Sequence, residues 1–148
     1  MDTTAEAGIS SVRLQLPEVA HTWGLIAPML QTVVEQVGGE YSLEDIYLRA
    51  LAGNVAIWVV YDGPKIWAVA VAEIAEYPGL RAYRVLALAG KDFERWKHLE
   101  AMVEEHARQL KCDVVEALCR PGMAKRLLPQ GYVPQCTVLR KKVDRRTH

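Results

Sequence analysis

The chain has 148 residues, of which 51% are hydrophobic and 24% charged, and its 18 Lys and Arg balance 18 Asp and Glu. This length is enough for one compact domain with a core of its own. A net charge of zero does not give the positive surface on which nucleic-acid binding depends, so we expect no nucleic-acid partner. No apolar run approaches the roughly 20 residues that a membrane-spanning helix needs. The small, acidic N-terminus lacks the basic start and the apolar stretch of a secretion signal.

The cysteines and histidines do not form a recognisable metal or disulfide pattern. Cys112, Cys119 and Cys136 are odd in number and widely spaced, which argues against a disulfide framework. His98 and His106 are about two helical turns apart, too far to hold one metal ion together. We therefore expect no metal site and an intracellular protein.

Hydrophobic periodicity predicts the first three elements. Residues 11–16 alternate between apolar and polar side chains, which indicates a short strand. Residues 17–37 have helical spacing, and Pro17 suits the first turn of such a helix. A second helix is expected to begin at Ser42, because Asp45 three residues later completes a sequence typical of a capping box.

The middle of the chain predicts three antiparallel strands. Residues 55–61 are almost continuously apolar, which favours a strand covered on both faces. Asp62-Gly63 is a strong hairpin signal, and residues 65–76 form the expected return strand. Residues 81–89 form the third strand.

The last third of the chain returns to helical periodicity. Residues 92–111 have one apolar stripe and predict a helix. Residues 113–118 are expected to form a strand and residues 121–128 a short helix that ends at Gly131. Residues 132–143 are expected to form the final strand.

The expected order is therefore β-α-α-β-β-β-α-β-α-β, which is an α/β (α+β) fold with a mixed central sheet. We expect a single domain over residues 11–143. A flexible N-terminus over residues 1–10 precedes it, and a basic tail over residues 144–148 follows it.

This order resembles the Gcn5-related N-acetyltransferase (GNAT) fold over nearly the whole domain. Gly131-Tyr132 is similar to the Gly-aromatic step before the last GNAT strand. A smaller group within that fold, encoded by tailed bacteriophages and prophages, gives a nearer resemblance. The residues that carry it are Asp62-Gly63, Tyr77-Pro78, Leu88-Ala89-Gly90, Trp96, the helix end over 105–112, and Arg120-x-Gly122.

The resemblance also identifies where a cofactor would bind. GNAT enzymes hold the diphosphate of acetyl-CoA on a turn with the pattern Arg/Gln-x-x-Gly-x-Gly/Ala, directly before a helix. Here only Gly90 of that pattern is present. Asp92 suits the N-cap of the helix, where its carboxylate would occupy the free N–H groups and repel a phosphate. We therefore expect no cofactor; in an active enzyme, acetyl-CoA would contact Ala89, Gly90, Lys91 and Arg95.

We expect catalytic residues only if the chain is an active acetyltransferase. Glu73 and Glu116 are strand carboxylates that suit a general base, and Tyr132 or Tyr83 suits the acid that protonates the leaving thiolate. The alternative is that these residues are structural, since none of them lies in a recognisable catalytic motif.

Two functions remain open from the sequence, besides a small regulatory binding module on the same scaffold. The favoured one is a catalytically silent GNAT-like domain that serves as a structural or assembly protein of a tailed-phage virion. It implies other phage structural proteins as partners in a symmetric oligomer, and a place in the virion or the host cytoplasm. The alternative is an acetyl-CoA-dependent N-acetyltransferase with an atypical cofactor loop. Fold alone does not choose between them.

Overall fold

The computed structural model of this chain describes residues 3–6, 8–36 and 40–145. The N-terminal half consists of β1 (Thr3–Glu6), β2 (Ile9–Arg13), α1 (Leu16–Gln36) and α2 (Leu43–Leu51). The C-terminal half consists of β3 (Ala56–Asp62), β4 (Lys65–Glu76), β5 (Arg81–Gly90), a 3-10 turn (Phe93–Arg95), α3 (Leu99–Gln109), β6 (Val114–Ala117), α4 (Pro121–Leu127) and a second 3-10 turn (Leu128–Gln130).

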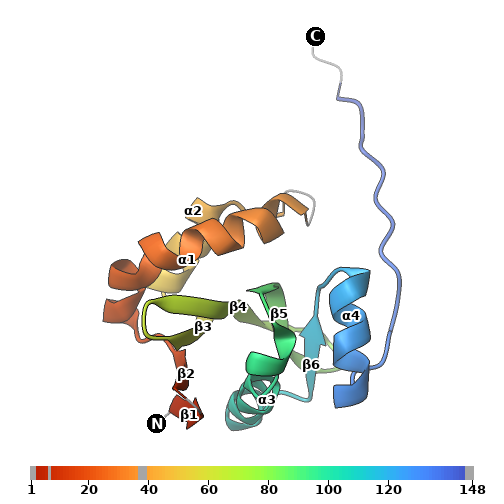
Figure 1. The fold of residues 1–148 in the computed structure, drawn as a ribbon. Coiled ribbons are helices and arrows are strands. Elements are labelled where there is room, and N and C mark those ends of the chain that lie inside the picture. Colours follow the sequence, from red (N-terminus) through yellow and green to blue (C-terminus); the bar gives the residue numbers. More distant parts are fainter. Residues whose placement is uncertain (1–2, 7, 37–39, 146–148) are drawn as a thin grey trace.

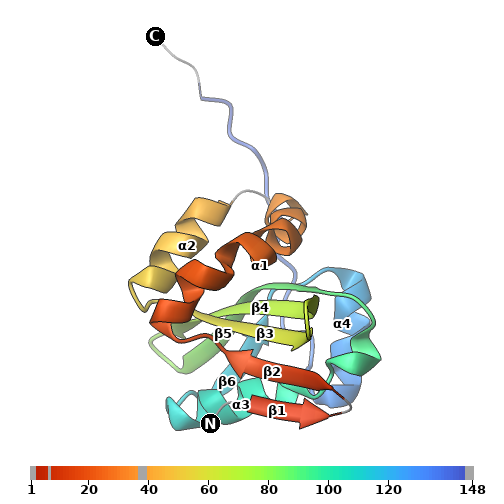
Figure 2. The ribbon, with the colours of Figure 1, turned by 60° about the vertical axis from the view of Figure 1, so that its left-hand side comes forward.

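The strands form one mixed sheet in the order β1-β2-β3-β4-β5-β6. Every neighbouring pair is antiparallel except β5 and β6, which are parallel. Helices α1 and α2 cover one face of the sheet, α3 lies against the other, and α4 stands beside β6 (Figures 1 and 2). The predicted mixed α/β sheet is confirmed.

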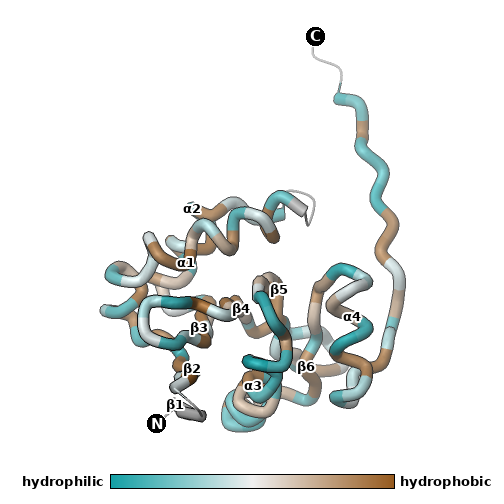
Figure 3. Tube along the Cα trace, viewed as in Figure 1, coloured by the Kyte–Doolittle hydropathy of each residue, from teal (hydrophilic) through white to brown (hydrophobic). Residues whose placement is uncertain are grey.

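Both faces of the central strands are buried. Figure 3 colours the chain by hydropathy, and these strands contain many hydrophobic residues. In β4, Val69 and Val71 pack under α1 and α2. The alternate residues Ala68, Ala70 and Ala72 pack against α3. A strand that is covered on both faces needs apolar residues at every position, and residues 66–72 of β4 are all apolar.

The start of α2 confirms the capping box. The Asp45 backbone N–H donates to Ser42 Oγ over 3.1 Å, and the Ser42 N–H donates to Asp45 Oδ2 over 2.9 Å. Two N–H groups that would otherwise have no partner in the helix are thereby satisfied.

The N-terminus differs from the expected flexible segment over residues 1–10. Strand β1 pairs antiparallel with β2, with Thr3 opposite Val12 and Glu6 opposite Ile9. This strand covers an edge of β2 that would otherwise present unpaired backbone groups. Residues 1, 2 and 7 lie outside the described residues.

The predicted helix over residues 92–111 is also shorter in the structure. The chain makes a 3-10 turn over Phe93–Arg95, and α3 begins only at Leu99. Asp92 has a left-handed conformation, with φ of 57°, which interrupts helical geometry directly after β5.

The predicted final strand over residues 132–143 is not formed. Among the described residues this segment pairs with no strand, and β6 is the edge of the sheet. Instead the segment leaves the body of the domain (Figures 1 and 2), and the Arg140 guanidinium forms an ion pair with Glu40. A strand requires a partner as well as a suitable sequence, and here none lies alongside. Of the predicted basic tail, residues 146–148 lie outside the described residues.

Candidate functional site

The parallel strands β5 and β6 pair over only part of their length. Their register runs from Ala82 opposite Val114 to Val85 opposite Ala117. Directly afterwards β5 contains a bulge, since Val85 and Ala87 face consecutive residues of β4 and Leu86 is the extra residue. Beyond it β5 continues to Gly90 while β6 ends. Bulges often end strand pairing beside a binding site, and the carboxyl ends of parallel strands are where α/β sheets bind ligands.

A cleft of about 390 Å³ opens where the two strands separate. One wall comes from α1, the second from the end of β5, and the third from the chain that joins β6 to α4. Its lining is mostly apolar, and Lys91 and Arg120 are its charged residues. Of the predicted cofactor-binding residues, Ala89, Gly90 and Lys91 line this cleft.

Arg95, the fourth of those residues, does not line the cleft. Its guanidinium stacks on the Trp67 ring, 4.7 Å from the ring centroid, and its Nε lies 2.9 Å from the Asp92 carboxylate. Asp92 itself makes no side-chain cap. The predicted N-cap role of Asp92 is therefore wrong, because its left-handed backbone turns the carboxylate toward Arg95.

In the turn after β5, the Lys91 backbone is already hydrogen-bonded within the domain. The Lys91 N–H donates to the Trp67 carbonyl over 2.9 Å, and the Trp96 indole N–H donates to the Lys91 carbonyl over 3.0 Å. A Cβ on Gly90 would lie 2.7 Å from the Trp96 ring. The indole thus occupies the space beside Gly90, and Gly90 and Lys91 themselves are exposed.

The N-terminus of α3 is occupied as well. The N–H groups of Leu99 and Glu100 donate to the carbonyls of Trp96 and Lys97, over 2.9 and 3.3 Å. Those helical N–H groups would have to be free to hold an anion. Of the GNAT phosphate-binding pattern only Gly90 is present at this turn, and the Lys91 N–H is already bonded.

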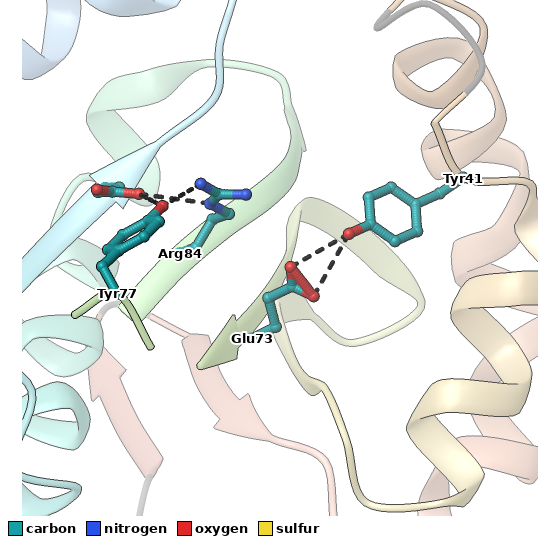
Figure 4. A network of polar contacts seen from close by, with 5 residues as sticks. Tyr41, Glu73, Tyr77 and Arg84 are labelled. Atoms are coloured by element: carbon teal, nitrogen blue, oxygen red, sulfur yellow. Dashed lines mark hydrogen bonds and ion pairs between the residues drawn. The ribbon is translucent and has the colours of Figure 1, made fainter. Parts of the chain in front are cut away.

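The predicted base Glu73 lies in a polar cluster on the α1–α2 face of the sheet (Figure 4). Its side chain is only 10% exposed, and it accepts hydrogen bonds from Tyr41 Oη at 3.1 Å and Arg49 Nη2 at 2.7 Å. Burial, together with the charge of Glu73, raises the pKa of Tyr41. Both of these partners hold the Glu73 carboxylate in place on the sheet.

Glu116, the second predicted base, is held in the same way. It accepts hydrogen bonds from Tyr77 Oη at 3.0 Å and from Arg84 Nε at 3.4 Å. Desolvation and the hydrogen bond to Glu116 raise the pKa of Tyr77. The strand register places Arg84 between Glu73 and Glu116, opposite both, so an arginine separates the two carboxylates.

The two candidate acids, Tyr132 and Tyr83, do not line the β5–β6 cleft. The Tyr132 hydroxyl bonds to Glu100 on α3, and burial together with that carboxylate raises the pKa of Tyr132. Tyr132 and Glu116 line one groove of about 640 Å³ along the outer edge of β6, away from the β5–β6 cleft lining. Tyr83 is buried in the core, where its hydroxyl contacts Trp58 and His106.

Sequence reasoning did not find Tyr41, Arg49, Tyr77 or Arg84. Each contacts one of the two carboxylates through strand register or helix packing, so spacing along the chain gives no signal for them. Within the described residues no group of three or more His, Cys, Asp or Glu side chains could hold a metal ion. The helices of that part of the chain include none that is long and apolar enough to cross a membrane.

Neither a protein-family model nor a curated protein sequence matches the chain. Solved structures do match. An aminoglycoside acetyltransferase from an uncultured soil metagenomic sample has a TM-score of 0.71 at 12% identity, covering 94% of this chain and 99% of that one. The fold is that of the GNAT acetyltransferases.

Two further acetyltransferase structures give the same result. A GCN5-related N-acetyltransferase from Ralstonia eutropha has a TM-score of 0.69 at 13% identity, over 92% of this chain and 99% of that chain. A predicted acetyltransferase with acetyl-CoA from Clostridium acetobutylicum has a TM-score of 0.64 at 10% identity, over 90% and 96%. At such low identity the GNAT likeness establishes the fold, and function has to be argued from the site.

Proposed function

We propose that this chain is a GNAT-fold domain that works by binding and does not transfer acetyl groups from acetyl-CoA. The observation that carries the proposal is the position of Trp96. Its ring packs on Gly90 and its indole N–H holds the Lys91 carbonyl. At the turn where GNAT enzymes bind the diphosphate, this domain therefore packs Gly90 against the buried Trp96 indole, while Gly90 and Lys91 themselves are exposed.

The candidate catalytic groups support the same proposal. Glu73 and Glu116 are each held by one arginine and one tyrosine. Neither carboxylate lines the β5–β6 cleft, and Tyr132 does not line it either. General acid–base catalysis needs the proton-transferring group within hydrogen-bond reach of the reacting atom.

Titration calorimetry of the full chain with acetyl-CoA, and with CoA as a second ligand, tests this proposal. We expect no heat of binding even at millimolar ligand. A single cooperative unfolding transition of the same protein shows that the sample is folded. Binding in the micromolar range would overturn the proposal.

The alternative function, an N-acetyltransferase with an atypical cofactor loop, has one observation in its favour. The β5–β6 cleft is apolar along its walls, and Lys91 and Arg120 line it. Their side chains could contact phosphate groups without a backbone cradle. If acetyl-CoA binds, charge reversal by Lys91→Glu with Arg120→Glu should abolish that binding, whereas Lys125→Glu on exposed α4 should not.

A structural or assembly role in a tailed-phage particle is the finer form of the proposal. Its support is the sequence resemblance, and no structural neighbour reported above carries such a role. A particle component occurs in a fixed, symmetric number of copies. Quantitative mass spectrometry of purified particles would test this, and a copy number that varies between preparations would contradict it.

A further inference from the structure

The walls of the β5–β6 cleft are apolar. Met29 and Val33 line it from α1, Leu88 lines it from β5, and Leu118 and Met123 line it from the chain around the start of α4. Its volume of about 390 Å³ is that of a site for a small molecule, and such sites are mostly apolar with a few polar groups. The walls therefore suit the hydrocarbon part of a ligand.

The charged residues of the cleft lie at one end of it. Lys91 directly follows β5, and Arg120 directly precedes α4, three residues after β6 ends. Because β5 and β6 are parallel, their carboxyl ends meet at the same edge of the sheet (Figure 1). Among the described residues that line the cleft, none is acidic. An anionic group would therefore be attracted to this end.

The donors at this end suit one carboxylate better than a phosphate. The Lys91 backbone N–H already donates to the Trp67 carbonyl over 2.9 Å, which leaves the side chains of Lys91 and Arg120 as the donors. A carboxylate has two oxygens, which an ammonium and a guanidinium can both bind. A phosphate group brings three strong acceptor oxygens and needs more donors.

The thiol of Cys119 does not oppose an anion in the cleft, although it belongs to the lining. Burial raises the pKa of the Cys119 thiol, so the thiol stays uncharged at neutral pH. Thr32, the other polar residue of the α1 wall, is uncharged as well. The cleft thus combines apolar walls with positive charge only.

We propose that the β5–β6 cleft binds a linear fatty acid, with the carboxylate at Lys91 and Arg120 and the hydrocarbon chain along the apolar walls. The inference rests on the proposed function, because it needs a cleft that acetyl-CoA does not occupy. It gives the chemical class of the ligand for that binding domain.

Titration calorimetry of the full chain with hexanoate, octanoate and decanoate tests the apolar walls. Each buried CH₂ contributes about 0.8 kcal/mol, so the Kd should fall about fifteenfold for each two further carbons. Decanol has the same chain as decanoate without the charge, and it should bind about tenfold more weakly. Equal Kd values for the three acids, or for decanol and decanoate, would overturn the proposal.

A matched pair of leucine variants places the ligand in the cleft. Leu118→Asp puts a carboxylate into the wall and should raise the Kd of decanoate about tenfold. Leu128→Asp is the control, because Leu128 lies outside the cleft lining and the two leucines are 37% and 47% exposed. It should leave the Kd unchanged. Each variant should first give one cooperative unfolding transition, and an equal loss of binding in both would contradict the assignment.

A pair of lysine variants tests the charged end. Lys91→Met removes the ammonium and keeps an apolar side chain, so it should raise the Kd of decanoate about fivefold and leave that of decanol unchanged. Lys125→Met on exposed α4 removes a charge outside the cleft lining and should change neither Kd. If Lys91→Met weakened decanol as much as decanoate, the carboxylate would not lie at Lys91.

The same protein titrated with acetyl-CoA separates this inference from the proposed function. Binding of decanoate without binding of acetyl-CoA supports both. If neither ligand binds, the fatty-acid inference is overturned and the proposed function stands. Micromolar binding of acetyl-CoA would overturn both, because the cleft would then hold the cofactor.

Discussion

The indole ring of Trp96 lies against the backbone of Gly90, so that a Cβ on residue 90 would stand 2.7 Å from Cε2 and Cζ2 of the ring. Gly90 is the one residue that the chain shares with the phosphate-binding pattern of GNAT enzymes. Here the missing side chain makes room for an aromatic ring. The same glycine thus has a packing role in this domain.

Gly90→Ala should therefore lower the free energy of unfolding. A contact of 2.7 Å with a ring forces either the ring or β5 to move, and such overpacking costs about 1–3 kcal/mol. Urea denaturation measures this loss. Gly24→Ala in α1 is the matched control: no heavy atom lies within 4 Å of its added Cβ, and alanine in a helix should raise stability by about 0.5–1 kcal/mol. Equal stability of Gly90→Ala and wild type would contradict the packing role.

Tyr83 should prove to be structural. Its hydroxyl accepts from Trp58 Nε1 over 3.1 Å and lies 2.7 Å from His106 Nδ1, within the core between β5 and α3. Tyr83→Phe removes that hydroxyl, so Trp58 Nε1 and His106 Nδ1 lose a buried hydrogen-bond partner. This loss should lower the free energy of unfolding by about 1–3 kcal/mol. Chemical denaturation checks this loss. Tyr47→Phe, which keeps the ring that contacts Trp23 at 5.0 Å between centroids, should change stability little.

The capping box at α2 predicts that its removal lowers the free energy of unfolding, and that its contribution to stability depends on pH. Ser42→Ala removes the oxygen that accepts from the Asp45 N–H and should cost about 1 kcal/mol. The hydrogen bonds from Ser42 lower the pKa of Asp45 in the folded state. Its contribution is therefore present above the unfolded pKa and is lost as pH falls through the folded pKa. The stability difference between wild type and Asp45→Asn should shrink over that acidic range; a constant difference would argue against the cap.

The sequence predicts the elements whose signals are local. Strands β3, β4 and β5 follow from their apolar runs and the turn at Asp62-Gly63, and α2 follows from Ser42 and Asp45. Strand β1, with the sequence TTAE, has no alternation and is formed by pairing with β2. Residues 132–143 show the reverse case, because a strand-like sequence does not specify which edge it will join.

The candidate site was predictable to the same limited degree. The cleft lies at Ala89, Gly90 and Lys91, where the strand-to-helix transition in the sequence places it. The pairing of Glu73 with Arg49 joins β4 to α2 across 24 positions of the chain. Contacts of this kind depend on how helices dock on the sheet, and residue spacing does not encode them.

The pKa of Glu100 is shifted in the opposite direction to that of Asp45, so the pH dependence of stability should be opposite as well. Burial and the neighbouring Glu104 raise the pKa of Glu100, and the hydrogen bond from Tyr132 offsets only part of that effect. A carboxyl whose pKa is raised on folding stabilises the fold below its unfolded pKa. That stability is lost as pH rises through the folded pKa. Glu100→Gln should therefore be more stable than wild type at neutral pH, because the neutral amide carries no charge into the groove.

Denaturation of wild type and Glu100→Gln across the acidic pH range tests this prediction. The difference between their free energies of unfolding should disappear once Glu100 is protonated. Glu94→Gln is the control. It removes an exposed carboxylate that pairs with Lys97 over 2.7 Å, and such a loss costs about 0.5 kcal/mol or less. If Glu100→Gln were instead less stable than wild type at neutral pH, the ionised carboxylate would be a favourable partner of Tyr132. Repulsion between Glu100 and Glu104 would then be outweighed by the hydrogen bond from Tyr132.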